Sequence, residues 1–199
     1  LNKKFIDITV DSIRIKGPSS IVFNPLQEVL FTDEYNFSDS SSDYICIDIG
    51  FNIGVTALKM ASKQNIKHIY SFEPFIPTAE KGEQNLQLNP ILSKKISLNK
   101  VGLGDKDKEM LISYNPEMLD AISTTNTSLF RGYKKEKIII RKADEILSPI
   151  LKKHSEKVFL KIDCEGAEFE IIPALDKSGI LEKADIIMME WHYNDPKIL

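Results

Sequence analysis

The chain has 199 residues and a formal net charge of −3, with 42% hydrophobic and 28% charged residues. This length suits one globular domain, or one domain with a small extension, and the composition is that of a soluble folded protein. The slight negative charge gives no reason to expect a nucleic-acid partner. The sequence lacks the run of about 20 apolar residues that spans a membrane, and its first residues lack the apolar segment of a signal peptide. We therefore expect a cytoplasmic protein without a membrane span.

The two cysteines, Cys46 and Cys164, do not form a CxxC pair and are too few for a zinc site. Each lies within or beside an apolar run that we expect to form a strand. Neighbouring strands would bring them fairly close to each other, but a reducing compartment favours free thiols.

The first 43 residues are expected to form a β extension to the main domain. Residues 5–10 and 13–16 read as two short strands around a turn, which predicts a hairpin. Residues 26–37 have a mixed pattern, and the serine-rich stretch at 38–43 predicts a polar loop or linker.

From Tyr44 onward, strands and helices alternate. In chain order the pattern predicts strand 44–50, helix 54–64, strand 68–74, helix 78–89 and strand 95–104. These strands lack a clean alternation of apolar and polar residues, which is typical of strands buried on both faces of a parallel sheet. We therefore predict an α/β fold with a doubly wound, mainly parallel sheet over residues 44–199.

The middle of the chain interrupts this alternation. Strand-like runs at 109–115 and 136–143 predict an antiparallel pair, joined by a long polar loop at 115–134. The α/β pattern then resumes, with helix 144–154, strand 158–163, helix 168–175 and strand 184–192.

The heptapeptide DIGFNIG, residues 48–54, joins the first strand of the α/β pattern to its first helix. In open parallel sheets, ligands bind beyond the carboxyl ends of the strands. Gly50 would let a ligand approach the backbone, and Gly54 would let the helix begin close by. The spacing differs from the G-x-G-x-x-G of dinucleotide sites, and the Asp48 carboxylate would repel a pyrophosphate. It would attract an ammonium group such as that of S-adenosylmethionine.

Glu73 ends the second strand of the α/β pattern, roughly 20 residues beyond the glycine loop, where an acid can accept hydrogen bonds from ribose hydroxyls. Both NAD and S-adenosylmethionine carry such hydroxyls, so Glu73 indicates a nucleoside cofactor without choosing between them. Phe75 either covers an adenine face or is a core aromatic. With Asp48 nearby, S-adenosylmethionine is the favoured cofactor.

A second polar group comes from KIDCEGAE, residues 161–168, and from MEWH at the end of the last strand. Asp163 and His192 are the catalytic candidates, because each is predicted at the carboxyl end of a strand beside the crevice. His192 could accept a proton from a hydroxyl near neutral pH, or only pack beside Trp191. Asp163 could orient the substrate or help Glu190 hold a metal. A carboxylate-rich rim does not establish a metal, and we predict none.

The segments DIGFNIG, YSFEP, KIDCEGAE and IIMMEWH occur in this order, and their combination resembles the FkbM-type family of S-adenosylmethionine-dependent methyltransferases. The resemblance covers about residues 44–193. It implies the Rossmann-like fold of class I methyltransferases and O-methylation of a hydroxyl on a sugar or natural product. It places Asp163 and His192 beside the acceptor. The residues for which it implies cofactor binding are Asp48, Gly50, Asn52, Gly54 and Glu73.

The chain departs from this family in two respects. Position 51 is Phe where the family often has a small residue such as Ala. The chain also ends soon after the fifth core strand, whereas a class I methyltransferase usually continues with a helix and an antiparallel pair of strands. We therefore expect a truncated or shortened C-terminal end.

The acceptor is expected to be a small molecule or a glycan, with contacts from residues 1–43 and from the loop at 115–134. The polar side chains of these segments would suit a sugar, but polar loops look alike when they bind nothing. Two other functions stay open at this point. One is a non-catalytic module that binds a nucleoside or a partner protein, and the other is an NAD-dependent oxidoreductase.

Overall fold

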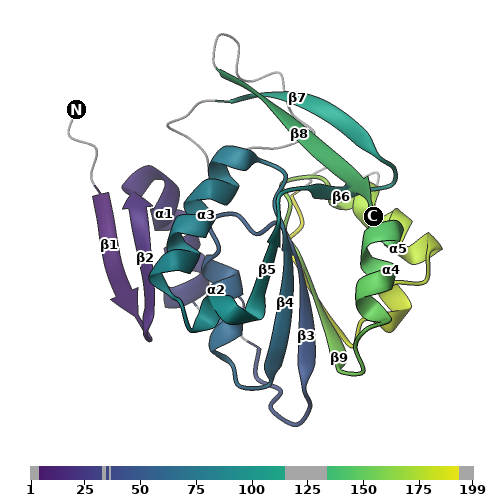
Figure 1. Ribbon diagram of the computed structural model, residues 1–199, viewed down its shortest axis with the longest axis horizontal. Coiled ribbons are helices and arrows are strands. Elements are labelled where there is room, and N and C mark those ends of the chain that lie inside the picture. Colours follow the sequence, from purple (N-terminus) through teal and green to yellow (C-terminus); the bar gives the residue numbers. More distant parts are fainter. Residues whose placement is uncertain (1–4, 33–34, 36, 115–133, 193–199) are drawn as a thin grey trace.

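The computed structural model describes residues 5–32, 35, 37–114 and 134–192, and these form three β-sheets with helices packed around them (Figure 1). The central sheet has five parallel strands in the order β10-β9-β3-β4-β5. Its strands are β3 (Tyr44–Ile49), β4 (Ile66–Phe72), β5 (Ile96–Asn99), β9 (Lys157–Ile162) and β10 (Ile186–Met189). The chain extends the sheet first on one side of β3 and then on the other. This confirms the predicted doubly wound α/β fold.

Helices cover both faces of the central sheet (Figure 1). On one face lie α2 (Val55–Ser62) and α3 (Ile76–Leu88), and on the other lie α4 (Ala143–Leu151) and α5 (Glu168–Lys177). All of β3 is buried, because a strand between two helical layers has no side that faces water. Its side chains alternate between the two cores. Cys46 belongs to the cluster that includes α2, and Ile47 to the cluster that includes α4 and α5.

The described N-terminal residues pack beside α3. The strands β1 (Phe5–Val10) and β2 (Ile13–Pro18) form the predicted antiparallel hairpin. The side-chain oxygen of Asn85 in α3 accepts a hydrogen bond from the backbone N–H of Lys16 at 3.0 Å, which attaches the hairpin to the domain. Our sequence analysis did not predict α1 (Ser19–Leu26) or the π-helical segment Gln27–Phe31 that follows it. Pro25 lies inside α1 and concealed the helical pattern.

A third, mixed sheet lies beside the carboxyl ends of the parallel strands. It contains β6 (Gly102–Gly104), β7 (Lys108–Tyr114) and β8 (Lys134–Lys142) in the order β6-β8-β7, and β7 pairs with β8 antiparallel, as predicted. The predicted strand 95–104 is in fact two strands, because the chain leaves the central sheet after β5 and enters this one at β6. Residues 115–133 of the predicted loop lie outside the described part of the chain.

The cysteines are free thiols in the structure. Strands β3 and β9 are neighbours, but Cys46 is paired with Phe159, and Cys164 comes five residues further along the chain. Cys164 lies beyond the end of β9, next to Gly50, and so is not opposite Cys46.

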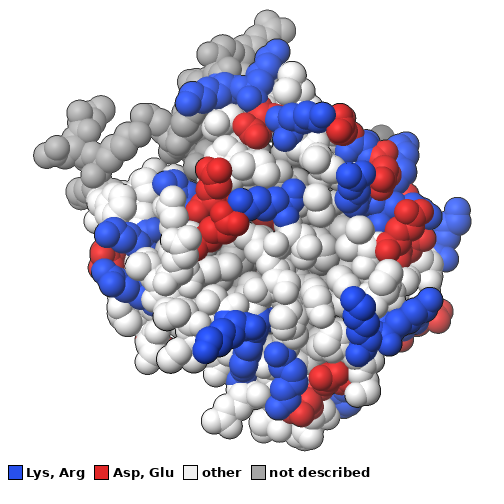
Figure 2. Space-filling view, in the orientation of Figure 1, with Lys and Arg blue, Asp and Glu red and all other residues white. Residues whose placement is uncertain are grey.

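On the surface in Figure 2, Lys and Arg side chains lie among Asp and Glu side chains. Within residues 5–32, 35, 37–114 and 134–192, no helix combines the length and the hydropathy needed to cross a membrane. The last described strand, β10, forms one edge of the central sheet. The prediction of a truncated or shortened C-terminal end falls outside the described residues.

Candidate functional site

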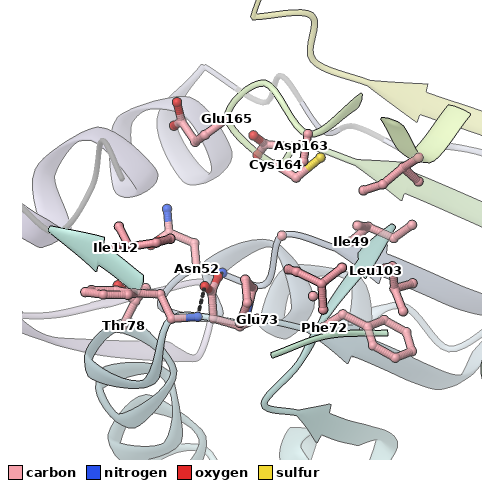
Figure 3. A pocket seen from close by; sticks show the side chains of 17 residues that line it. Ile49, Asn52, Phe72, Glu73, Thr78, Leu103, Ile112, Asp163, Cys164 and Glu165 are labelled. Atoms are coloured by element: carbon pink, nitrogen blue, oxygen red, sulfur yellow. Dashed lines mark hydrogen bonds between the residues drawn. The ribbon is translucent and has the colours of Figure 1, made fainter. Parts of the chain in front are cut away.

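A cavity lies at the carboxyl ends of β3, β4 and β9 (Figure 3). Its position is the one at which doubly wound sheets bind ligands. The third sheet closes one side with apolar side chains. The residues that line the cavity include Gly50, Asn52, Glu73, Phe75, Ile112, Ile140, Asp163 and Glu165.

Glu73 presents an anchored carboxylate to this cavity. The backbone N–H of Asn52 donates to its Oε2 at 2.9 Å, and the backbone N–H of Phe75 donates to its Oε1 at 3.0 Å. The carboxylate thus joins the glycine loop to the start of α3 and cannot easily turn away. Burial raises the pKa of Glu73 to about 7, against the effect of the two N–H groups. Its position fits the predicted acceptor for ribose hydroxyls.

Asn52 is held in a strained backbone conformation at the cavity wall. Its φ is 53°, in the left-handed region that non-glycine residues rarely occupy. The side-chain Oδ1 is buried and has no hydrogen-bond donor within the described structure. An unsatisfied buried acceptor costs about 1–3 kcal/mol, so this oxygen is suited to receive a hydrogen bond from a ligand.

The two glycines of the loop have different structural roles. A Cβ at Gly50, whose φ is +92°, would lie 1.6 Å from the carbonyl oxygen of Asp163, so the loops after β3 and β9 touch only because residue 50 lacks a side chain. Gly50 also lines the cavity. A Cβ at Gly54 would lie 2.5 Å from the ring of Phe51. Gly54 therefore allows packing, and its contact with a cofactor stays a prediction.

Asp48 and Lys161 form a buried ion pair near the carboxyl ends of β3 and β9. Asp48 Oδ1 lies 3.3 Å from Lys161 Nζ, and the hydroxyl of Ser71 donates to Asp48 Oδ2 at 2.7 Å. Lys161 also donates to the carbonyl of Gly50 at 2.6 Å and lies 3.3 Å from Asp163 Oδ2. Burial opposes the charge of Lys161, yet the carboxylates of Asp163 and Asp48 raise its pKa above the ordinary range. Lys161 is therefore protonated and holds the two strand ends together.

The prediction that Asp48 attracts the ammonium group of the cofactor, directly or through a water, rested on its place in the loop. In the structure Asp48 is only 2% exposed, and it acts on the loop through Lys161 and Ser71. Direct contact with a ligand stays a prediction. We had assigned no role to Lys161, although a lysine inside the apolar strand VFLKI is itself a signal of a buried partner.

The catalytic candidates Asp163 and His192 do lie together. His192 Nε2 is 3.8 Å from Asp163 Oδ1, and His192 Nδ1 is 2.8 Å from Oε1 of Glu168, which is fully buried. Because a carboxylate oxygen accepts, Nδ1 carries the proton in this contact and Nε2 keeps its lone pair in the neutral ring. Burial lowers the pKa of His192, but Glu168 and its neighbouring carboxylates raise it overall.

Asp163, Glu168, Glu190 and His192 form a polar cluster, and Tyr35 reaches it from the N-terminal extension. Its hydroxyl lies 2.9 Å from Asp163 Oδ2 and 3.2 Å from Glu190 Oε2, and the residue is 5% exposed. Burial and the two carboxylates raise the pKa of Tyr35, so the hydroxyl stays protonated. Sequence reasoning missed Tyr35 because 128 positions separate it from Asp163 and no local pattern marks it.

These features define a doubly wound α/β protein with a ligand cavity where the strand order reverses and an acid anchored at the end of β4. Residues 48–198 match the family described as the methyltransferase FkbM domain. The chain therefore belongs to the FkbM methyltransferase family.

Two of the curated relatives carry methyltransferase names. The chain is 25% identical over 194 residues to Methyltransferase 1 of Beauveria bassiana (strain ARSEF 2860), a match that covers 84% of this chain and 76% of the relative. It is 24% identical over 211 residues to Methyltransferase sdnD of Sordaria araneosa, covering 92% and 81%.

A solved structure, methyltransferase FkbM from Methylobacillus flagellatus KT, superposes with a TM-score of 0.50 at 16% identity. The match covers 82% of this chain and 36% of the solved chain, so this chain corresponds to about a third of that protein. The likeness supports the fold.

Proposed function

We propose that the protein is an S-adenosylmethionine-dependent O-methyltransferase that acts on a hydroxyl of a small molecule or glycan in the cytoplasm. The observation that carries the proposal is the anchored carboxylate of Glu73 inside the cavity of an FkbM-family chain. A fixed acid at the end of the second core strand is the group that a nucleoside's ribose hydroxyls require.

The residues of the cavity fit this cofactor. Glu73 would accept hydrogen bonds from the ribose, and the unsatisfied Oδ1 of Asn52 would accept a further one. The apolar wall of Phe75, Ile112 and Ile140 would receive the adenine. When bound, the cofactor supplies an electrophilic methyl group on a sulfonium, so the protein has only to align the acceptor oxygen and remove its proton.

On the acceptor side we assign Asp163 and His192. Asp163 lines the cavity and also contacts His192 in the polar cluster. It therefore connects the proposed cofactor region with this cluster, which forms the rim of the cavity. His192 presents Nε2 toward that rim because Glu168 holds Nδ1. A neutral imidazole in this orientation can accept the proton of a hydroxyl, directly or through a water molecule. Tyr35 adds a contact from the N-terminal extension, where we expected the acceptor to bind.

Calorimetric titration with S-adenosylmethionine, S-adenosylhomocysteine and NAD tests the cofactor. Glu73→Ala should weaken S-adenosylmethionine binding by about 1.5–3 kcal/mol, the range for hydrogen bonds to a charged group. Glu80→Ala, which removes an exposed carboxylate from α3, is the matched control and should bind normally. Equal affinities for the folded Glu73 variant and the wild type would remove Glu73 from the site.

Turnover on a panel of hydroxylated acceptors, followed by release of S-adenosylhomocysteine, tests the reaction. Methylation of a hydroxyl supports the proposal. Cofactor binding without turnover on any acceptor would favour a non-catalytic nucleoside-binding module, and binding of NAD in its place would favour an oxidoreductase.

A further inference from the structure

The polar cluster at the cavity rim has the composition of a metal site. Asp163, Glu190 and His192 each offer one ligand atom, and these atoms all lie within 4.8 Å of one another. They come from the ends of β9 and β10, two adjacent parallel strands. On the sequence alone we predicted no metal, because a carboxylate-rich rim does not establish one.

The orientation of the ligand atoms is the first argument. The Tyr35 hydroxyl contacts Oδ2 of Asp163 and Oε2 of Glu190. The opposite oxygens, Oδ1 and Oε1, are the ones that approach His192 Nε2, at 3.8 and 3.4 Å. Each carboxylate thus contacts the Tyr35 hydroxyl through one oxygen and approaches Nε2 of His192 with the other.

The spacing of these atoms is the second argument. Separations of 3.4 and 3.8 Å are longer than ordinary hydrogen bonds. Two ligands at about 2.1 Å from a tetrahedrally bound cation lie roughly 3.4 Å apart. Glu165 Oε2 also lies 3.8 Å from the same Nε2 and adds negative charge beside the three ligand atoms.

Glu168 supplies a separate observation. It is 0% exposed, its Oε1 is 2.8 Å from His192 Nδ1, and its Oε2 is buried without a hydrogen-bond donor in the described part of the chain. A fully buried carboxylate directed at the far nitrogen of a histidine is the usual partner of a metal-binding imidazole, which it orients and makes more basic. A cation on Nε2 would also compensate the negative charge that Glu168 brings into the protein.

We propose that Asp163, Glu190 and His192 bind one divalent transition-metal cation, with Glu168 orienting the histidine. A mixed set of imidazole and carboxylate ligands suits Mn²⁺, Fe²⁺ or Zn²⁺ better than the all-oxygen preference of Mg²⁺ or Ca²⁺. Three protein ligands leave coordination positions open. His192 and Asp163 are 19% and 23% exposed at their side chains, so an incoming molecule can reach them.

The inference deepens the proposed function and rests on it for the role of the metal. The cation would lie at the rim that Asp163 shares with the cofactor cavity. There it would bind the acceptor hydroxyl and lower its pKa. With Nε2 on the cation, Asp163 and His192 would act on the acceptor through the metal, and the proton of the hydroxyl would pass to solvent water in place of the direct acceptance by His192 given under the proposed function.

The test is metal binding by the whole chain. Protein freed of metal with a chelator is titrated with Mn²⁺, and binding is followed by calorimetry and by the electron paramagnetic resonance signal of free Mn²⁺. We expect one Mn²⁺ per chain. His192→Gln and Glu190→Gln should each weaken binding by more than about 100-fold, and Glu168→Gln by about 10–100-fold. Glu182→Gln, which removes an exposed carboxylate from the short 3₁₀ segment Leu181–Lys183, should leave it unchanged.

His192 and Glu190 lie on the rim and not in the core, so their variants should fold, as circular dichroism would check. Absence of saturable Mn²⁺ binding at millimolar concentration, or binding that both variants retain, would overturn the inference. Titration of the same metal-free protein with S-adenosylhomocysteine separates the two proposals. Cofactor binding without Mn²⁺ binding rejects the metal alone, and Mn²⁺ binding without cofactor binding rejects the proposed function.

Discussion

The ring of Phe51 occupies the space that a side chain at Gly82 would need. A Cβ built on Gly82 would lie 2.2 Å from Cε1 of Phe51, and one built on Gly54 would lie 2.5 Å from Cζ of the same ring. Phe51 is 2% exposed, between the loop after β3 and helix α3. The departure from a small residue at position 51 is therefore accommodated by glycines at positions 54 and 82.

Gly82→Ala should destabilise the protein by about 1–3 kcal/mol, the usual cost of overpacking a core. This is the opposite of the gain of up to about 1 kcal/mol that Ala normally brings to a helix. Urea unfolding measures the effect. In a Phe51→Leu background the same change should be neutral or stabilising, because the ring is gone. A stabilising Gly82→Ala in the wild-type background would contradict the packing.

Lys161→Met should cost about 3–5 kcal/mol of unfolding free energy, because it leaves the buried carboxylate of Asp48 without its cation. The loss should be smaller at pH 4 than at pH 7, since protonation of Asp48 removes the uncompensated charge. Lys157→Met, at the exposed start of the same strand, is the control and should change stability little. A loss below about 1 kcal/mol for Lys161→Met would mean that the ion pair is not needed.

The stability of the ligand-free protein should fall as pH rises from about 5 to 8, because of Glu73. Burial raises the pKa of Glu73 from its ordinary value of 4.5 to about 7. Between these values the unfolded chain has released a proton that the folded chain still holds, so raising the pH favours unfolding. At about 1.4 kcal/mol per unit, the full effect is of order 3 kcal/mol.

Urea unfolding at several pH values tests this dependence. Glu73→Gln cannot titrate at this position and should show a flatter profile, whereas the control Glu80→Gln should follow the wild type. Identical profiles for the wild type and Glu73→Gln would show that Glu73 titrates normally.

His192→Ala should lower turnover by about 10²–10⁴-fold and leave S-adenosylmethionine affinity nearly unchanged. Proton acceptance and metal binding both require the neutral imidazole, so wild-type turnover should rise with pH. Its midpoint should lie above 6.5, because Glu168 and the neighbouring carboxylates raise the pKa of His192 overall. His154→Ala, at a histidine bonded to Tyr70 outside the cavity, is the control. A His192 variant that keeps more than about a third of the rate would exclude both roles.

Local sequence patterns were sufficient for much of the fold. Continuous apolar runs predicted the strands from β3 to β10, and apolar residues at helical spacing predicted the helices between them. Each pattern can be recognised within its own segment, because a strand buried on both faces of a sheet is apolar along its whole length. They failed at α1, where Pro25 masks the helix, and at β5 and β6, where the chain changes sheets without a change in composition.

The sequence by itself determined which groups lie at the carboxyl ends of the strands, because strand direction and residue order dictate that. It thus brought Glu73, Asp163 and His192 to one edge of the sheet. The tertiary structure decided what each group contacts. Asp48 contacts Lys161, Tyr35 reaches Asp163 from the N-terminal extension, and Glu168 at the start of α5 contacts His192. Such contacts depend on loop paths and on packing between layers, which join residues far apart in the chain and leave no periodic signal in it.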